Sequence, residues 1–236
     1  MVLNTIVADS LDFMAEKIQA KIKTGTALNS AANEIITDVL KKHQRIIFNG
    51  DNYTNEWKQE AEKRGLPNHI STADALSALT EESTYELFGK YNVLNKTEIE
   101  SRYNVKLEKY ILKLEIEFKA CLDMASTIIL PAAVAGQTKL AESINATKQL
   151  LGKEPSGQKE ILERITSNIE SMIKASDELK AILAKTPKES LVHALYYKDF
   201  ALAGMNKIRK YADALELLID DELWPLPKYR EMLLLL

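Results

Sequence analysis

Apolar residues recur along this chain mainly at intervals of three and four, the spacing that places side chains on one face of an α-helix. One such pattern runs from Val2 to Ile22, and a second runs from Leu28 to Leu40. The 8 Gly and 6 Pro residues are about half the usual share, which disfavours the turn-rich all-β classes. We therefore predict an all-α protein.

Three long helices are predicted after Asn92, because no Gly or Pro occurs between Tyr91 and Leu130 and because apolar residues then alternate in steps of three and four. We expect these helices to pack as an antiparallel bundle, with a kink at Pro131, which lacks a backbone donor. The predicted core positions are Leu107, Ile111, Leu114, Phe118, Cys121, Ala125 and Ile128; Leu162, Ile165, Ile169, Met172, Ser176, Leu179 and Leu183; and Ala201, Met205, Ile208, Ala212, Leu215 and Ile219.

Short helices are predicted between the first two helices and the bundle. Thr54 is a suitable N-cap for a helix that ends at Gly65, and two further helices are expected to open at Ser71 or Thr72 and at Thr80. Residues 46–48 are too few for a helix and precede a turn cluster, so we predict a short extended stub there.

Polar residues also predict where the long helices begin and end. Asn95, with Glu98 three residues later, has the spacing of a reciprocal cap. Ser156 is a candidate cap for the second long helix, and the run 186–189 (TPKE) indicates a capping box with Pro187 at the first helical position. We expect the last helix to end at the two prolines of 224–227, which favour an extended tail.

These elements predict three regions: two helices in residues 1–44, short helices in 45–92, and the long-helix bundle with an extended Pro-rich tail in 93–236. The net charge of -3 provides no basic field for a phosphate backbone, so we expect no nucleic-acid partner. No run of 18 apolar residues and no signal peptide is evident, and the one cysteine excludes an internal disulfide. A cytoplasmic protein without a membrane partner is expected.

Residues that carry chemistry are scattered. His43, His69 and His193 lack a second ligand at helical spacing, and Cys121 sits on an apolar seam. The run 50–52 (GDN) lacks the glycines and the Lys-Ser/Thr pair of a phosphate loop and indicates a turn. We therefore predict no catalytic, cofactor-binding or metal-binding residue in this chain.

Two other groups of polar residues have structural interpretations. The acidic run 220–222 lies near the carbonyl end of a helix, where it is either solvated or paired with a partner's cation. Four tyrosines on helices are expected to fill gaps between helices rather than to stack on bases: Tyr103, Tyr110, Tyr196 and Tyr197.

The first helix begins without a cap, because no Ser, Thr, Asp or Asn precedes Val2. Its apolar surface is also wider than one packing stripe, since Phe13 lies away from the line through Leu3, Val7 and Leu11. Both features favour a chain cut from a longer polypeptide, with part of this helix packed against a missing partner.

Several runs resemble the C-terminal region of type III glutamine synthetases, in the order of that family. They are 2–8 (VLNTIVA), 45–51 (RIIFNGD), 60–68 (EAEKRGLPN), 100–103 (ESRY) and 222–227 (ELWPLP). The resemblance spans nearly the whole chain, although residues 132–183 are generic helix.

The resemblance implies an enzyme that makes glutamine from glutamate, ammonia and ATP with Mg²⁺ or Mn²⁺, in a ring-shaped homo-oligomer whose active sites lie between catalytic domains. The metal-, nucleotide- and glutamate-binding residues of that family would precede Met1, so none is carried over. Residues 1–44 would close the catalytic domain and lead out of it. Two functions remain open: a non-catalytic C-terminal domain of such an enzyme, or a related helical adaptor that acts alone.

Overall fold

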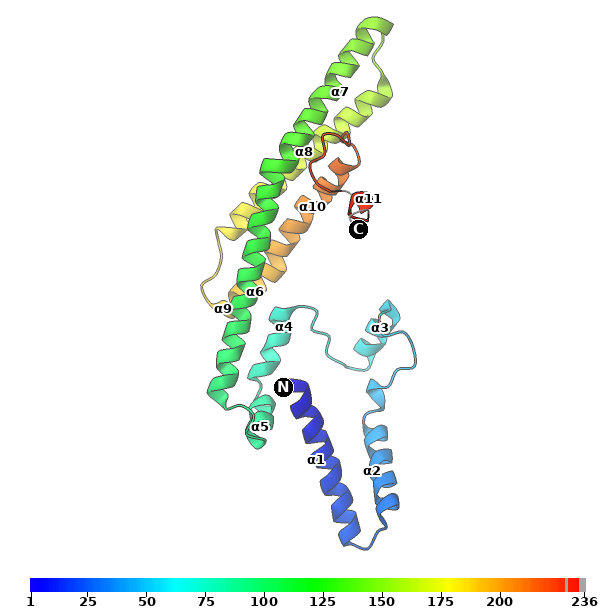
Figure 1. Ribbon diagram of the computed structural model, residues 1–236, viewed down its shortest axis with the longest axis vertical. Helices are drawn as coiled ribbons and strands as arrows, with labels where there is room; N and C mark the ends of the chain where they lie inside the picture. The colour runs from blue at the N-terminus through cyan, green and yellow to red at the C-terminus, as the bar shows by residue number, and fades with distance from the viewer. Residues whose placement is uncertain (228, 234–236) are drawn as a thin grey trace. The chain divides into compact units, whose positions relative to one another are not determined.

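The computed structural model describes residues 1–227 and 229–233. In this part of the chain every regular element is helical, which confirms the all-α prediction. The chain forms two compact units, residues 1–106 and 107–236. Figure 1 labels the helices of both units.

The first unit contains a helical hairpin and a set of short helices. Its hairpin turns at Gly25, whose φ of +95° suits glycine. Phe88, Leu94 and Ile99 form a small buried core. The elements are α1 (Val2–Lys23), α2 (Leu28–Lys42), η1 (Gln44–Ile46), α3 (Asn55–Lys63), α4 (Thr72–Leu76), η2 (Ser77–Thr80) and α5 (Glu82–Lys90), followed by the start of α6 (Lys96–Met124).

Local capping chemistry determines several of these boundaries as predicted. The Thr54 and Ser71 side chains accept hydrogen bonds from backbone N–H groups in the first turns of α3 and α4. At the start of α6, Asn95 Oδ1 accepts from Glu98 N at 2.9 Å, and Glu98 Oε2 accepts from Asn95 N at 2.8 Å. Each capping side chain bonds to a backbone group no more than three residues away, so the sequence pattern reveals it.

Two predictions in this unit were wrong in detail. Ile46 is the last residue of the 3₁₀ turn η1, so extended backbone begins only at Ile47. The helix expected to open at Thr80 begins instead at Glu82, because Ser77–Thr80 forms the 3₁₀ turn η2. In η2 the Thr80 hydroxyl donates to the Ser77 carbonyl at 2.9 Å. It therefore bonds back to the preceding turn instead of capping the helix that follows.

The second unit is the predicted bundle. Figure 1 shows α8 running back along α7, and α10 running beside α8 in the opposite direction. Gly152, at φ +68°, ends α7 before the turn into α8. The elements after α6 are η3 (Ala125–Ile129), α7 (Leu130–Leu151), α8 (Ser156–Leu183), α9 (Ser190–Tyr196), η4 (Tyr197–Ala201), α10 (Leu202–Glu216) and α11 (Tyr229–Met232).

A π-helical turn, η3, shifts the buried face of the first long helix. Leu107, Leu114 and Phe118 are buried as predicted, but at the end of η3 it is Ile129 that is buried rather than Ile128. A π turn closes an i→i+5 hydrogen bond and so inserts one residue into the helical register. It lies just before Pro131, whose missing N–H is accommodated without a break in the helix.

The buried faces of the other two long helices largely follow the predicted spacing. Ile165, Ile169, Met172 and Leu179 are buried in α8, and Ile208, Ala212 and Leu215 are buried in α10. Ala175 and Gly204 take the buried places expected for Ser176 and Met205, one residue earlier in each case.

Three boundary predictions in this unit were wrong. Ser156 is the first residue of α8 and makes no cap. The Thr186 hydroxyl donates to the Leu183 carbonyl at 2.7 Å, while the Glu189 carboxylate accepts from Leu191 N and Val192 N and so caps α9. A carboxylate side chain can accept from the N–H groups two and three residues after it, which a pattern of residue types does not distinguish from a capping box.

The last long helix ends at Glu216, eight residues before Trp224, where it was expected to end. Asp220 Oδ1 accepts from Glu222 N at 3.1 Å, a local side-chain turn that competes with helix. Trp224 is nevertheless buried, with 8% of its surface exposed, so the tail is held against the bundle as expected. Residues 224–227 contain no helix, whereas α11 follows; the remaining tail residues, 228 and 234–236, lie outside the described part.

One helical segment in the described chain, Lys96–Leu151, contains an 18-residue window with a mean hydropathy of 1.5 and so meets the length and composition of a membrane span. Of that window 22% is buried, and the segment contacts α8 and α10. One such segment does not by itself indicate a membrane span.

Candidate functional site

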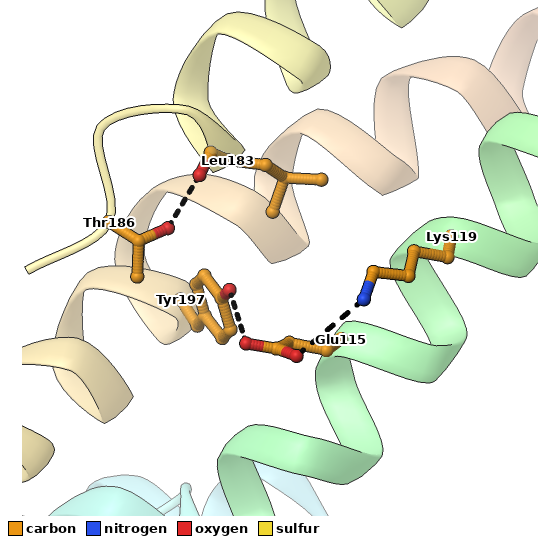
Figure 2. Close-up of a pocket in the computed structure, with 5 residues that line it drawn as sticks. All are labelled: Glu115, Lys119, Leu183, Thr186 and Tyr197. Carbon is orange, nitrogen blue, oxygen red and sulfur yellow. Dashed lines mark hydrogen bonds and ion pairs between the residues drawn. The ribbon is translucent and has the colours of Figure 1, made fainter.

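A cavity of about 300 Å³ opens in the second unit between α6, the end of α8 and the start of η4. Figure 2 shows the five side chains that line it. They are Glu115, Lys119, Leu183, Thr186 and Tyr197.

Helical spacing brings together two of the polar side chains of this cavity. Glu115 and Lys119 are four residues apart on α6 and therefore share a face. Tyr197 opens the π turn η4 and is 3% exposed, with its ring edge-on to Phe118 at a centroid distance of 5.2 Å. Its hydroxyl donates to Glu115 Oε1 at 3.2 Å.

His193 stands next to the cavity, one helical turn before Tyr197. The two rings meet edge to face with centroids 4.3 Å apart. His193 Nε2 is buried, has no hydrogen-bond partner among the described residues, and lies 4.0 Å from Glu115 Oε1. Burial lowers the pKa of His193, and the nearby Glu115 carboxylate only partly opposes this, so the imidazole is neutral at pH 7.

The loop between α8 and α9 closes the cavity. The Thr186 hydroxyl donates to the Leu183 carbonyl, and the Tyr196 hydroxyl donates to the Ile182 carbonyl at 3.0 Å. Both carbonyls belong to the last turn of α8, and the Ile182 carbonyl also accepts from Lys185 N at 3.1 Å. The two hydroxyls therefore fix the loop that carries Thr186 over the cavity.

Three polar groups surround the Glu115 carboxylate. Its contacts are the Tyr197 hydroxyl at 3.2 Å, His193 Nε2 at 4.0 Å and Lys119 Nζ at 3.8 Å. Strong charge-assisted hydrogen bonds are about 2.7–2.9 Å long, so none of these contacts is of that kind.

The three histidines singled out from the sequence do not converge. His43 follows α2 and His69 precedes α4, and both are exposed. Among the described residues no group of three His, Cys, Asp or Glu side chains could hold a metal ion. The prediction that this chain carries no catalytic, cofactor or metal residue stays a prediction.

Cys121 and the acidic run 220–222 also have local explanations. Cys121 is half-buried beside a groove of about 540 Å³ between α6 and α10, and burial raises the pKa of its thiol. Asp220 pairs with Lys139 Nζ of α7 at 2.5 Å, so the cation beside this run comes from the same chain.

Sequence reasoning considered Tyr196 and Tyr197 as fillers between helices, and both do pack there. It missed Glu115, Lys119 and Thr186 as parts of one cavity. An i,i+4 Glu–Lys pair is common on exposed helix faces, and its position beside Tyr197 depends on how α6 and η4 pack.

Comparison with known proteins identifies relatives over the whole chain. Residues 31–148 match the family model of the glutamine synthetase C-terminal domain. The type-3 glutamine synthetase of Dictyostelium discoideum is 36% identical over 100% of this chain and 33% of that protein. A glutamine synthetase of Bacteroides fragilis is 31% identical over 98% of the chain and 33% of its own length. The chain thus spans about a third of the curated relatives it matches.

Proposed function

This chain belongs to the glutamine synthetase C-terminal domain family, and we propose that it serves as the non-catalytic helical domain of a type III glutamine synthetase. In the full-length enzyme, catalytic domains make glutamine from glutamate, ammonia and ATP, and this domain contributes to subunit structure and to assembly of a ring-shaped homo-oligomer in the cytoplasm. The ATP and the Mg²⁺ or Mn²⁺ ions bind elsewhere in that enzyme.

The outward-facing apolar stripe of α1 is the observation that carries this proposal. Leu3, Val7 and Leu11 follow one another at steps of four and are 76%, 56% and 57% exposed. Thr5 is the one residue of α1 that is buried. An apolar stripe of this kind on a helix marks a surface that packs against a partner.

Polar contacts hold the other side of α1 in the first unit. The Tyr91 hydroxyl lies 3.0 Å from Asp9 Oδ1 and 2.8 Å from Asp12 Oδ2, within hydrogen-bond distance of both carboxylates, and Lys90 Nζ pairs with Asp9 at 2.9 Å. These polar contacts turn the acidic side of α1 toward its own unit, which leaves the apolar stripe for the catalytic domain.

Hydrogen exchange in a monomeric sample tests this interpretation. A helix whose apolar side lacks a partner opens at a much lower free energy than a bundle core. We expect residues 2–14 to exchange much faster than residues 107–128, in which Leu107, Leu114 and Phe118 are buried. Equal protection of the two segments would favour the stand-alone adaptor instead.

Ligand binding provides a second, independent test. We expect calorimetric titration of this chain with ATP and Mg²⁺ to give no binding in the micromolar range, and an activity assay to detect no glutamine. The described residues contain no cluster of three metal-ligating side chains that would fit these ions. Micromolar ATP binding would contradict the proposal.

A further inference from the structure

We propose that His193, Glu115 and Tyr197 form a proton-operated switch in the second unit. When the imidazole takes up a proton, it takes the Glu115 carboxylate from the Tyr197 hydroxyl, which then donates to Thr186 of the loop between α8 and α9. The inference goes beyond the structural role proposed above and does not depend on it.

Two groups compete for one oxygen atom of Glu115. Glu115 Oε1 accepts a hydrogen bond from the Tyr197 hydroxyl at 3.2 Å, and the same atom lies 4.0 Å from His193 Nε2. That nitrogen is buried and has no hydrogen-bond partner among the described residues. A charge-assisted hydrogen bond needs about 2.8 Å between the two atoms, so a movement of about 1 Å separates the two arrangements.

The charge of the ring decides which arrangement is favoured. A neutral imidazole carries one N–H, whereas an imidazolium carries an N–H at both ring nitrogens and a positive charge. Its Nε2–H therefore donates to Glu115 Oε1 more strongly than a neutral phenol does. The His193 and Glu115 side chains are only 15% and 31% exposed, so solvent screens this attraction incompletely.

The other groups around the ring leave this exchange open. Lys119 Nζ approaches the second carboxylate oxygen of Glu115, Oε2, at 3.8 Å, and its side chain is 77% exposed. Figure 2 shows this ammonium on the opposite side of Glu115 from Tyr197. The Tyr196 hydroxyl is engaged with the Ile182 carbonyl at 3.0 Å. Glu115 is therefore the group that receives the imidazolium.

The Tyr197 hydroxyl has a second acceptor to turn to. The Thr186 side chain is also a hydrogen-bonding neighbour of this hydroxyl. Its own proton goes to the Leu183 carbonyl at 2.7 Å, which leaves the lone pairs of its oxygen to accept. Protonation of His193 therefore moves the hydrogen bond of Tyr197 from α6 to the loop.

The switch operates on the acid side of neutrality. Burial lowers the pKa of His193, and the Glu115 carboxylate opposes this only in part. The ring is neutral at pH 7, and the exchange occurs as the pH falls below about 6.5, the usual pKa of histidine.

The test is a pH titration of the whole chain followed by NMR. We expect the Tyr197 Cζ signal to move with the same midpoint as the imidazole signal of His193, because the hydroxyl changes its partner when the ring is protonated. Tyr211 of α10, whose ring lies 5.9 Å from Lys210 Nζ, is the control and should not move. A constant Tyr197 signal during the titration of His193 would overturn the proposal.

Two variants separate the exchange from simple proximity. Glu115→Gln removes the charge that attracts the imidazolium and should weaken proton binding by His193 about tenfold. Tyr197→Phe removes the competitor for Oε1 but keeps the ring that packs on Phe118, and it should strengthen proton binding about threefold. The matched control is Glu117→Gln, which removes another carboxylate of α6 and should leave the midpoint of His193 unchanged.

Either variant can contradict the proposal. Unchanged proton binding in Glu115→Gln would do so, and so would unchanged or weaker proton binding in Tyr197→Phe. The amide oxygen in the Glu115→Gln variant can still accept from the Tyr197 hydroxyl, so this variant should fold. Should it not fold, Tyr197→Phe and the Tyr197 signal of the unaltered chain decide the matter.

Discussion

Replacing Gly136 by alanine tests how closely α7 packs on the chain after α10. An ideal Cβ at this position would lie 2.8 Å from Ile219 Cδ1 and 3.3 Å from Ile219 Cγ2. Ile219 is 6% exposed, and its β-branched side chain has little freedom to move. Overpacking of this kind costs roughly 1–3 kcal/mol, whereas alanine is favoured over glycine in a helix by about 1 kcal/mol.

We therefore expect Gly136→Ala to lower the free energy of unfolding by about 1 kcal/mol net. Substitutions at two other helical glycines separate the cost of overpacking from the gain in helix propensity. A Cβ at Gly157 of α8 meets nothing within 4 Å, so Gly157→Ala should be neutral or stabilising by up to about 1 kcal/mol. A Cβ at Gly204 would lie 3.2 Å from Leu179 Cδ1, so Gly204→Ala should fall between the two.

The assay is urea unfolding followed by tryptophan fluorescence. The chain has two tryptophans, and a Trp57→Phe background leaves Trp224 as the reporter of the second unit. Ile219→Val removes the Cδ1 atom and should cost about 0.5–1.5 kcal/mol alone, but much less in a Gly136→Ala background, with a coupling on the order of 1 kcal/mol. If Gly136→Ala proves as stable as Gly157→Ala, the inferred close packing is wrong.

Three further predictions concern the tail, the cavity and the start of α6. Trp224→Ala should lower the free energy of unfolding by roughly 3–5 kcal/mol, because a buried indole is removed; a denaturant shift worth less than about 1 kcal/mol would mean a loose tail. Burial lowers the pKa of His193 below its unfolded value of about 6.5, so the unfolded chain binds more protons as the pH falls through that range and stability declines. His193→Gln should lose less stability than the wild type between pH 7.5 and 5.5, and parallel profiles would contradict this. Asn95→Ala should cost about 1 kcal/mol in thermal or urea unfolding through loss of the reciprocal cap, whereas Asn104→Ala, at an exposed position inside α6, should cost nothing.

Local signals account for the parts of the fold that could be predicted. The caps at Thr54, Ser71 and Asn95 and the stop at Gly65 act within a few residues, so residue types at fixed spacing reveal them. The long helices follow from apolar spacing, since each must bury one face. The sequence also showed that the apolar surface of α1 is wider than one contact needs, because of Phe13; that the line through Leu3, Val7 and Leu11 is itself exposed came from the structure.

Where two residues could each cap the same helix, tertiary contacts rather than the local sequence decided between them. Thr186 and Glu189 both have cap chemistry, and the sequence alone does not rank them. The structure engages Thr186 with the end of α8 and leaves Glu189 to cap α9. In the same way, Thr80 was a good cap by type but is occupied within a 3₁₀ turn.

By itself the sequence determined the all-α class, the order of the helices, the caps at Thr54, Ser71 and Asn95, and the family to which the chain belongs, because all of these rest on local spacing or on recognisable runs. Tertiary packing alone decided the two π turns, the exchange of Ile128 for Ile129 in the core, and the cavity at Glu115. A π turn inserts one residue without changing residue types, and a cavity forms from side chains of helices far apart in the chain. Both depend on how those helices pack, which periodicity along one helix does not encode.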